Sequence, residues 1–118
     1  MKMLKLGSMA LLCAALSACG IEVPADKSDY VGFWRSESGA VRLRIAQDGR
    51  VNYGKSDGNS STEINAPIQS FDGDDFNVGM FGFKARFQVS VPPHDVGDEM
   101  RMTVDGVQLV RVDDQVER

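Results

Sequence analysis

The chain contains very little cysteine and histidine and has no excess of basic side chains. Of its 118 residues, 2 are Cys, 1 is His and 4 are Pro. The formal net charge is −4, so the chain lacks the basic footprint that nucleic-acid binding needs. With 42% hydrophobic and 25% charged residues, the composition excludes a disordered or collagen-like protein. A chain of this length forms one small domain at most.

The sequence also lacks a hydrophobic run long enough to span a bilayer, which takes about 20 residues in a helix. An uncharged, largely apolar stretch at residues 6–18 follows Lys2 and Lys5. A positive start followed by a short apolar run is typical of a secretory signal. We therefore predict that residues 1–18 form a signal helix that is removed from the mature protein.

The stretch ends in Leu16-Ser17-Ala18-Cys19, which closely resembles the lipobox of bacterial lipoproteins. The resemblance implies cleavage before Cys19, a diacylglyceryl group on its sulfur, and acylation of its new amino group by a chain such as palmitate. Because each buried CH₂ contributes about 0.8 kcal/mol, three acyl chains make a lasting anchor. The alternatives are a secreted protein that is cut elsewhere and an uncleaved start helix.

The residue after the cysteine indicates which of the two membranes would hold the lipoprotein. In Gram-negative bacteria an Asp at that position tends to retain lipoproteins at the inner membrane, whereas this chain has Gly20. The resemblance thus implies an outer-membrane lipoprotein with its domain in the periplasm. Cys13 would leave with the signal and Cys19 would carry lipid, so the mature domain would have no disulfide. Loss of Lys2 and Lys5 leaves 11 of the 13 Lys and Arg residues against 17 Asp and Glu residues, a net charge of −6.

The mature chain divides into three parts. Residues 19–29 are polar, include Pro24 and show no regular period, which indicates a lipidated N-terminus and tether. Residues 30–112 contain short alternating apolar runs separated by turn residues, the spacing of an all-β domain. Residues 113–118 form a polar C-terminal tail.

The alternation predicts about eight strands in an antiparallel up-and-down meander. Two hairpins are expected at Asp-Gly pairs, one at Asp48-Gly49, a turn suited to positive φ, and one on the two-residue turn Asp105-Gly106. Pro67 indicates an edge or bulge, and Pro92-Pro93 is expected to end the longest run, residues 83–91. Because closure removes exposed strand edges, we expect a closed barrel or a curled sandwich.

The pair Trp34 and Arg111 carries a second resemblance. Gly32-Phe33-Trp34 at the head of the first expected strand, with Arg111 on the last, is similar to the pattern of lipocalins and other calycins. In that family the tryptophan packs across the closed end of the barrel against the arginine, a cation–π contact. The resemblance implies a barrel-closing pair and, as an alternative function, a carrier of a small apolar ligand.

A third alternative is an inhibitor of a cationic hydrolase such as lysozyme. Small envelope β-barrels include lipoprotein inhibitors of lysozyme and periplasmic inhibitors of metalloproteases, and Ser38-Gly39-Ala40 is similar to the loop motif of the former. A net acidic surface would suit a cationic target. This alternative predicts that acidic loop residues converge at one end.

Residues that could carry chemistry have simpler interpretations here. Asp72-Gly73-Asp74-Asp75 offers oxygen ligands for Ca²⁺ but lacks the EF-hand loop, so we predict a hairpin turn and no metal. His94 beside Asp95 could act as a general base, but no nucleophile motif accompanies it. We therefore predict a solvated loop there, no cofactor and no enzymatic activity.

An aromatic at a hairpin bend is the clearest candidate for contact with a ligand or partner. Phe81 falls out of alternation between Met80 and Phe83. Either the bend returns Phe81 to the core, or the three residues form an exposed binding tip. Five basic residues are expected on the outward face of the sheet: Arg42, Arg44, Lys84, Arg86 and Arg101. They are expected to form a solvated face paired with acidic neighbours, or else a patch for an anionic partner.

The sequence thus predicts a non-enzymatic, outer-membrane-anchored periplasmic lipoprotein that acts as a binding or structural protein of the envelope. Its expected partners are the membrane, through the lipid on Cys19, and an envelope protein, with no nucleic acid. A filled domain interior would favour this role. A carrier would need a continuous apolar cavity of roughly 300 Å³ or more.

Overall fold

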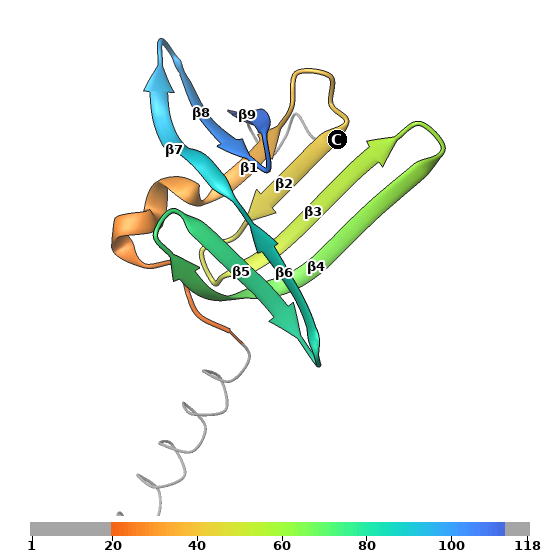
Figure 1. The fold of residues 1–118 in the computed structure, drawn as a ribbon. Helices are drawn as coiled ribbons and strands as arrows, with labels where there is room; N and C mark the ends of the chain where they lie inside the picture. Colours follow the sequence, from red (N-terminus) through yellow and green to blue (C-terminus); the bar gives the residue numbers. More distant parts are fainter. Residues whose placement is uncertain (1–19, 113–118) are drawn as a thin grey trace, which may run out of the picture.

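The computed structural model describes residues 20–112, which form an all-β domain (Figure 1). The predicted signal helix, Cys19 and the predicted polar tail lie outside the described residues. A short 3₁₀ helix precedes nine strands: η1 (Ala25–Tyr30), β1 (Gly32–Arg35), β2 (Val41–Ile45), β3 (Arg50–Asp57), β4 (Ser60–Asp72), β5 (Asp75–Met80), β6 (Phe83–Phe87), β7 (Val89–Val96), β8 (Glu99–Val104) and β9 (Val107–Val112). No helix within residues 20–112 is long and apolar enough to cross a membrane.

All nine strands belong to one antiparallel sheet with the order β6-β5-β4-β3-β2-β1-β9-β8-β7. Figure 1 shows that the sheet curls into a half-barrel. The two edge strands, β6 and β7, are consecutive in the chain and only Gln88 separates them. The chain itself therefore links the two edges of the sheet. The predicted all-β meander is confirmed, with nine strands in place of about eight.

Apolar side chains from the inner face fill the curve of the sheet. Strand β2 shows why: Val41, Leu43 and Ile45 are buried while the residues between them are exposed, the period of a strand with one wet face. Sixteen apolar residues are buried in one cluster: Val23, Tyr30, Trp34, Val41, Leu43, Ile45, Val51, Ala66, Ile68, Phe76, Val78, Phe87, Val89, Met102, Val104 and Leu109.

Aromatic rings dominate one part of this core. Phe76 stacks on Phe87 with ring centroids 5.0 Å apart, and Tyr30 meets Phe76 edge-on at 6.2 Å. The Tyr30 hydroxyl donates to the carbonyl of Asp74 at 2.8 Å. Burial, reinforced by the nearby charges of Asp74 and Asp75, raises the pKa of Tyr30 to about 12.

The two hairpins expected on Asp-Gly turns are present. β8 and β9 are joined by the two-residue turn Asp105-Gly106, whereas β2 and β3 are joined by residues 46–49, with Asp48-Gly49 at the end of this connection. Gly49 has φ +92° and Gly106 has φ +81°, which glycine tolerates because it has no Cβ. Turn residues and alternation together were sufficient to predict these two hairpins.

The expected run over residues 83–91 is wrong as a single strand. It divides at Gln88, so that β6 pairs with β5 and β7 pairs with β8. Nor does Pro92-Pro93 end the strand, because β7 continues through both prolines to Val96. β7 is an edge strand with register shifts between Val91 and His94, and an edge or bulge is where a missing N–H is tolerated.

Pro67 and its neighbours behave as the sequence indicates. β4 pairs with β3 as far as Pro67 and with β5 from Ile68 onward, with a bulge between Ile68 and Ser70. At 13 residues, β4 is longer than the other strands. The bulge bends β4 where its pairing changes from β3 to β5, and so contributes to the curl of the sheet.

Residues 20–24 differ from the free tether that the sequence indicates. The Ile21 amide donates to the carbonyl of Ile68 at 3.0 Å, and the Val23 amide donates to the carbonyl of Gln47 at 3.0 Å. The Gln47 side chain also donates a hydrogen bond from Nε2 to the carbonyl of Val23 at 3.1 Å. The side chain of Val23 is buried in the core. We call this segment the strap, because it is bound to the sheet over its length.

Candidate functional site

The β5–β6 turn has an unusual residue at its first position. Met80 pairs with Phe83, which leaves Phe81-Gly82 as a two-residue turn. Both turn residues have positive φ, +55° for Phe81 and +86° for Gly82. Two-residue hairpin turns of this kind strongly favour Asn, Asp or Gly at both positions. A phenylalanine there holds a backbone conformation that its Cβ disfavours.

The ring of Phe81 points into solvent. Phe81 is 98% exposed, and its neighbours Phe83 and Met80 are 48% and 42% exposed. Of the two alternatives left by the sequence, the structure places Phe81 outside the core. We call Met80, Phe81 and Phe83 the apolar tip. A large apolar side chain that is both strained and exposed is typical of a contact surface.

Substitution of Phe81 by asparagine is expected to stabilise the domain. Asparagine accepts positive φ more readily than phenylalanine and loses no packing, because the ring is exposed. The expected gain is about 1 kcal/mol in the free energy of unfolding, or roughly 4–8 °C in Tm. Urea and thermal denaturation followed by circular dichroism measure it.

The matched control is Phe81→Ala, which removes the ring but keeps a Cβ at the same positive φ. It should leave stability nearly unchanged. An alanine variant as stable as the asparagine variant would show that the ring, and not the backbone, is the source of the strain.

The base of the apolar tip is held by the β4 bulge. The Gln69 side chain donates from Nε2 to the carbonyl of Gly79 at 2.9 Å. A Cβ at Gly79 would lie 2.5 Å from the carbonyl oxygen of Phe83, so only glycine permits the close approach of β5 and β6 here. The tip is therefore a fixed extension of the sheet.

The strap and the apolar tip border one surface hollow. Its lining includes Gly20 at the start of the strap and Met80 at the base of the tip, together with Pro67 and Arg50. Gly20 itself lies against Pro67, since a Cβ there would be 2.7 Å from the proline Cβ. Sequence reasoning missed this proximity, because residues 20–24 carry no strand or helix period.

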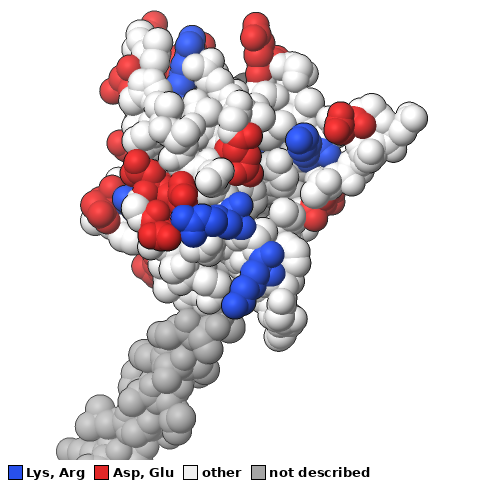
Figure 2. Space-filling view, viewed as in Figure 1, with Lys and Arg blue, Asp and Glu red and all other residues white. Residues whose placement is uncertain are grey.

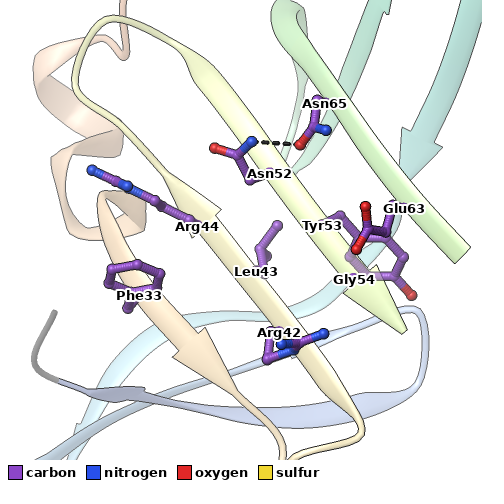
Figure 3. Close-up of a pocket in the computed structure, with 9 residues that line it drawn as sticks. All are labelled: Phe33, Arg42, Leu43, Arg44, Asn52, Tyr53, Gly54, Glu63 and Asn65. Atoms are coloured by element: carbon purple, nitrogen blue, oxygen red, sulfur yellow. Dashed lines mark hydrogen bonds between the residues drawn. The ribbon is translucent and has the colours of Figure 1, made fainter. Parts of the chain in front are cut away.

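A second hollow lies on the outward face of β1 to β4 (Figure 3). The Arg44 guanidinium lies over the Phe33 ring, 5.0 Å from its centroid. The Asn52 amide donates to the Asn65 carbonyl, the dashed line in Figure 3. The lining also carries the charged side chains of Arg42 and Glu63.

Two of the five outward cations are paired with acidic neighbours. Arg86 contacts Asp75 at 2.8 Å and Asp72 at 3.1 Å, and Arg101 contacts Glu99 at 2.9 Å. These pairs are on the surface and each contributes little to stability. For these two cations the pairing agrees with the solvated-face interpretation, whereas Arg42, Arg44 and Lys84 form no such pair among the described residues.

The structure brings Trp34 and Arg111 together. They are opposite one another on β1 and β9, and the guanidinium lies 5.8 Å from the centroid of the Trp34 rings. Trp34 is fully buried and its Nε1 donates to the carbonyl of Tyr30 at 2.9 Å. Gly32 leaves room for the arginine, because a Cβ there would be 2.7 Å from Arg111 Cδ. The pair joins β1 to β9, which are neighbours in the middle of the sheet order.

The acidic turn between β4 and β5 stabilises the place where the sheet edges meet. Asp75 Oδ1 accepts the Val89 amide at 2.7 Å, and its Oδ2 accepts Arg86 Nη2 at 2.8 Å. The Val89 hydrogen bond, followed by the Arg86 hydrogen bond, lowers the pKa of Asp75. Because Val89 begins β7, this carboxylate joins β5 to the opposite edge of the sheet.

Asp75 is expected to make the domain sensitive to acid. Its pKa in the folded state lies below its value in the unfolded state, about 3.9. The stabilisation is therefore present above about pH 4 and is lost as pH falls through the folded pKa. Asp75→Asn should be less stable than the wild type at neutral pH and should lose less stability between about pH 5 and pH 2. Urea denaturation across this range measures both effects.

Asp98→Asn, in the exposed β7–β8 turn, is the control for a general effect of net charge. It should leave stability at neutral pH unchanged. Equal acid sensitivity in the wild type and Asp75→Asn would contradict the assigned role.

His94 lies in the edge strand β7 and not in the loop that the sequence predicts, although its side chain is exposed as expected. Its Nδ1 lies 3.0 Å from the carbonyl of Pro92, a local contact within β7. Within residues 20–112, no group of three or more His, Cys, Asp or Glu residues is arranged to hold a metal ion. Asp105, interpreted from the sequence only as a turn residue, also accepts the Gln88 amide at 2.9 Å and so fixes the β6–β7 link.

Comparisons of the chain with protein-family models, with curated proteins and with solved structures find no match.

Proposed function

We propose that this chain is an outer-membrane lipoprotein, anchored through Cys19, whose β domain acts in the periplasm as a non-enzymatic binding or structural protein. The observation that carries a binding role is the exposure of Phe81, at 98%, on a strained turn. Selection for stability alone would remove such a residue, because a better turn residue is available at the same position. The lipobox Leu16-Ser17-Ala18-Cys19 supports the anchor.

The packed interior supports this role over that of a carrier. Trp34, Phe76, Leu43, Ile45, Ile68 and Met102 are among the largest fully buried side chains. They occupy the curve of the sheet where a carrier would hold an apolar ligand. The inhibitor alternative gains no support from the acidic turn, because Arg86 binds two of its carboxylates.

Intact mass of detergent-extracted protein tests the anchor. We expect the mass of residues 19–118 plus glycerol and three acyl chains, lost in a Cys19→Ala variant. Cys13→Ala is the matched control, because Cys13 would leave with the signal and the mature mass should not change. An unmodified mass, or cleavage at another residue, would overturn the proposal.

A further inference from the structure

The strap and the apolar tip are held by neighbouring residues of β4. Ile68 accepts the hydrogen bond of the Ile21 amide at 3.0 Å, and Gln69 donates to Gly79 at the base of the tip at 2.9 Å. Figure 1 shows the first described residues, in red-orange, at the same end of the domain as the β5–β6 turn. The point where the chain enters the domain and the tip are thus fixed relative to one another.

Little chain separates this end of the domain from the proposed anchor. Gly20 directly follows Cys19, and Ile21 is already hydrogen-bonded to the sheet. Consecutive Cα atoms are about 3.8 Å apart, so the Ile21 Cα lies within about 8 Å of the Cys19 Cα. A lipid on Cys19 would therefore hold this end of the domain against the bilayer surface.

The chemistry of the tip suits the interface of a phospholipid bilayer. An aromatic ring and a thioether side chain, both exposed, are groups that partition into the boundary between headgroups and acyl chains. Lys84 follows Phe83 directly on β6 and is exposed, as a basic residue beside anionic headgroups should be. In Figure 2 the end with the β5–β6 turn shows white and blue atoms, and the red atoms lie over other parts of that face.

We infer that the apolar tip of Met80, Phe81 and Phe83 inserts into the phospholipid surface in which Cys19 is anchored. The inference rests on the proposed lipid anchor and adds a second, protein-borne contact to it. The two contacts together restrict the tilt of the domain, which a single anchored point would leave free.

Phe81→Trp, read by quenching with brominated lipids, tests the inference. The detergent-extracted variant is reconstituted into phosphatidylethanolamine–phosphatidylglycerol vesicles with brominated acyl chains. The indole introduced at the tip should lose most of its emission, and the fully buried Trp34 of the wild type supplies the background. The matched control is Asn59→Trp, on the exposed β3–β4 turn at another corner of the domain in Figure 1, which should keep its emission.

The intact mass of each sample separates this inference from the proposed function. Quenching of acylated Phe81→Trp without quenching of acylated Asn59→Trp supports insertion. No quenching of acylated Phe81→Trp, or equal quenching of the two variants, overturns insertion and leaves the anchor in place. Emission from Phe81→Trp that is blue-shifted but unquenched also overturns insertion, and assigns the tip to a protein partner or a second copy. An unacylated mass overturns the anchor, and the inference with it.

Discussion

Replacement of Trp34 by alanine is expected to lower the free energy of unfolding by about 3–5 kcal/mol. The indole is fully buried, donates to the carbonyl of Tyr30 at 2.9 Å and lies beneath the Arg111 guanidinium. The substitution leaves a cavity in the core, an unpaired buried carbonyl and an arginine without its ring. Since domains of this size are stable by about 5–15 kcal/mol, the variant should be close to its unfolding threshold.

Urea denaturation followed by far-ultraviolet circular dichroism measures this loss, because the variant has no tryptophan to follow. Phe33→Ala is the matched control on the same strand. Its half-buried ring lies on the outward face beside the Arg44 guanidinium, so the expected loss is smaller, about 1 kcal/mol. Equal losses at the two positions would contradict the assignment of Trp34 to the buried core. Trp34→Phe should fall between them, since it keeps a ring but not the hydrogen bond.

Local pattern explains which parts of the fold could be predicted. In β2 the alternation of Val41, Leu43 and Ile45 identifies the buried face without reference to any other segment. Asp105-Gly106 then specifies its hairpin as a two-residue turn, and Gly49, with φ +92°, ends the connection from β2 to β3. The resemblance at Trp34 and Arg111 predicted a contact between the first and the last strand, and the structure places the two side chains in contact.

Contacts between distant segments account for what could not be predicted. The strap binds to Gln47 and Ile68, but its own residues show no period that a reader could follow. The division at Gln88 depends on Asp75 and Asp105, which come from other turns. Alternation predicts which face of each strand is buried, but it does not predict which neighbouring strand will pair with it.

The candidate site divides in the same way. Departure from alternation singled out Phe81 between Met80 and Phe83, so the apolar tip could be found from the sequence. That the Phe81 ring points into solvent could not be predicted, because phenylalanine disfavours a turn position with φ +55°. Its proximity to the strap required the bulge at Gln69, a tertiary feature of β4.

Gly49→Ala is expected to displace the strap from the sheet. Gly49 has φ +92°, and a Cβ there would lie 1.8 Å from the carbonyl oxygen of Ile21. Backbone strain at a positive φ costs about 1–3 kcal/mol, and the overlap with the strap comes in addition. The expected loss in the free energy of unfolding is at least about 2 kcal/mol. Hydrogen exchange should show lost protection at the Ile21 and Val23 amides, which bond to the sheet in the wild type.

Gly58→Ala isolates the contribution of the strap. Gly58 has φ +64° in the β3–β4 turn, and a Cβ there would meet no atom within 4 Å, so the substitution brings strain without overlap. Protection at Ile21 and Val23 should therefore survive in Gly58→Ala and fail in Gly49→Ala. Protection that survives in both would mean that the strap can shift around a methyl group.

If the strap is what aligns the tip with the bilayer, adding Gly49→Ala to Phe81→Trp should also reduce quenching of the introduced indole while the acylated mass persists. The anchor would then remain, and the orientation of the domain would be lost.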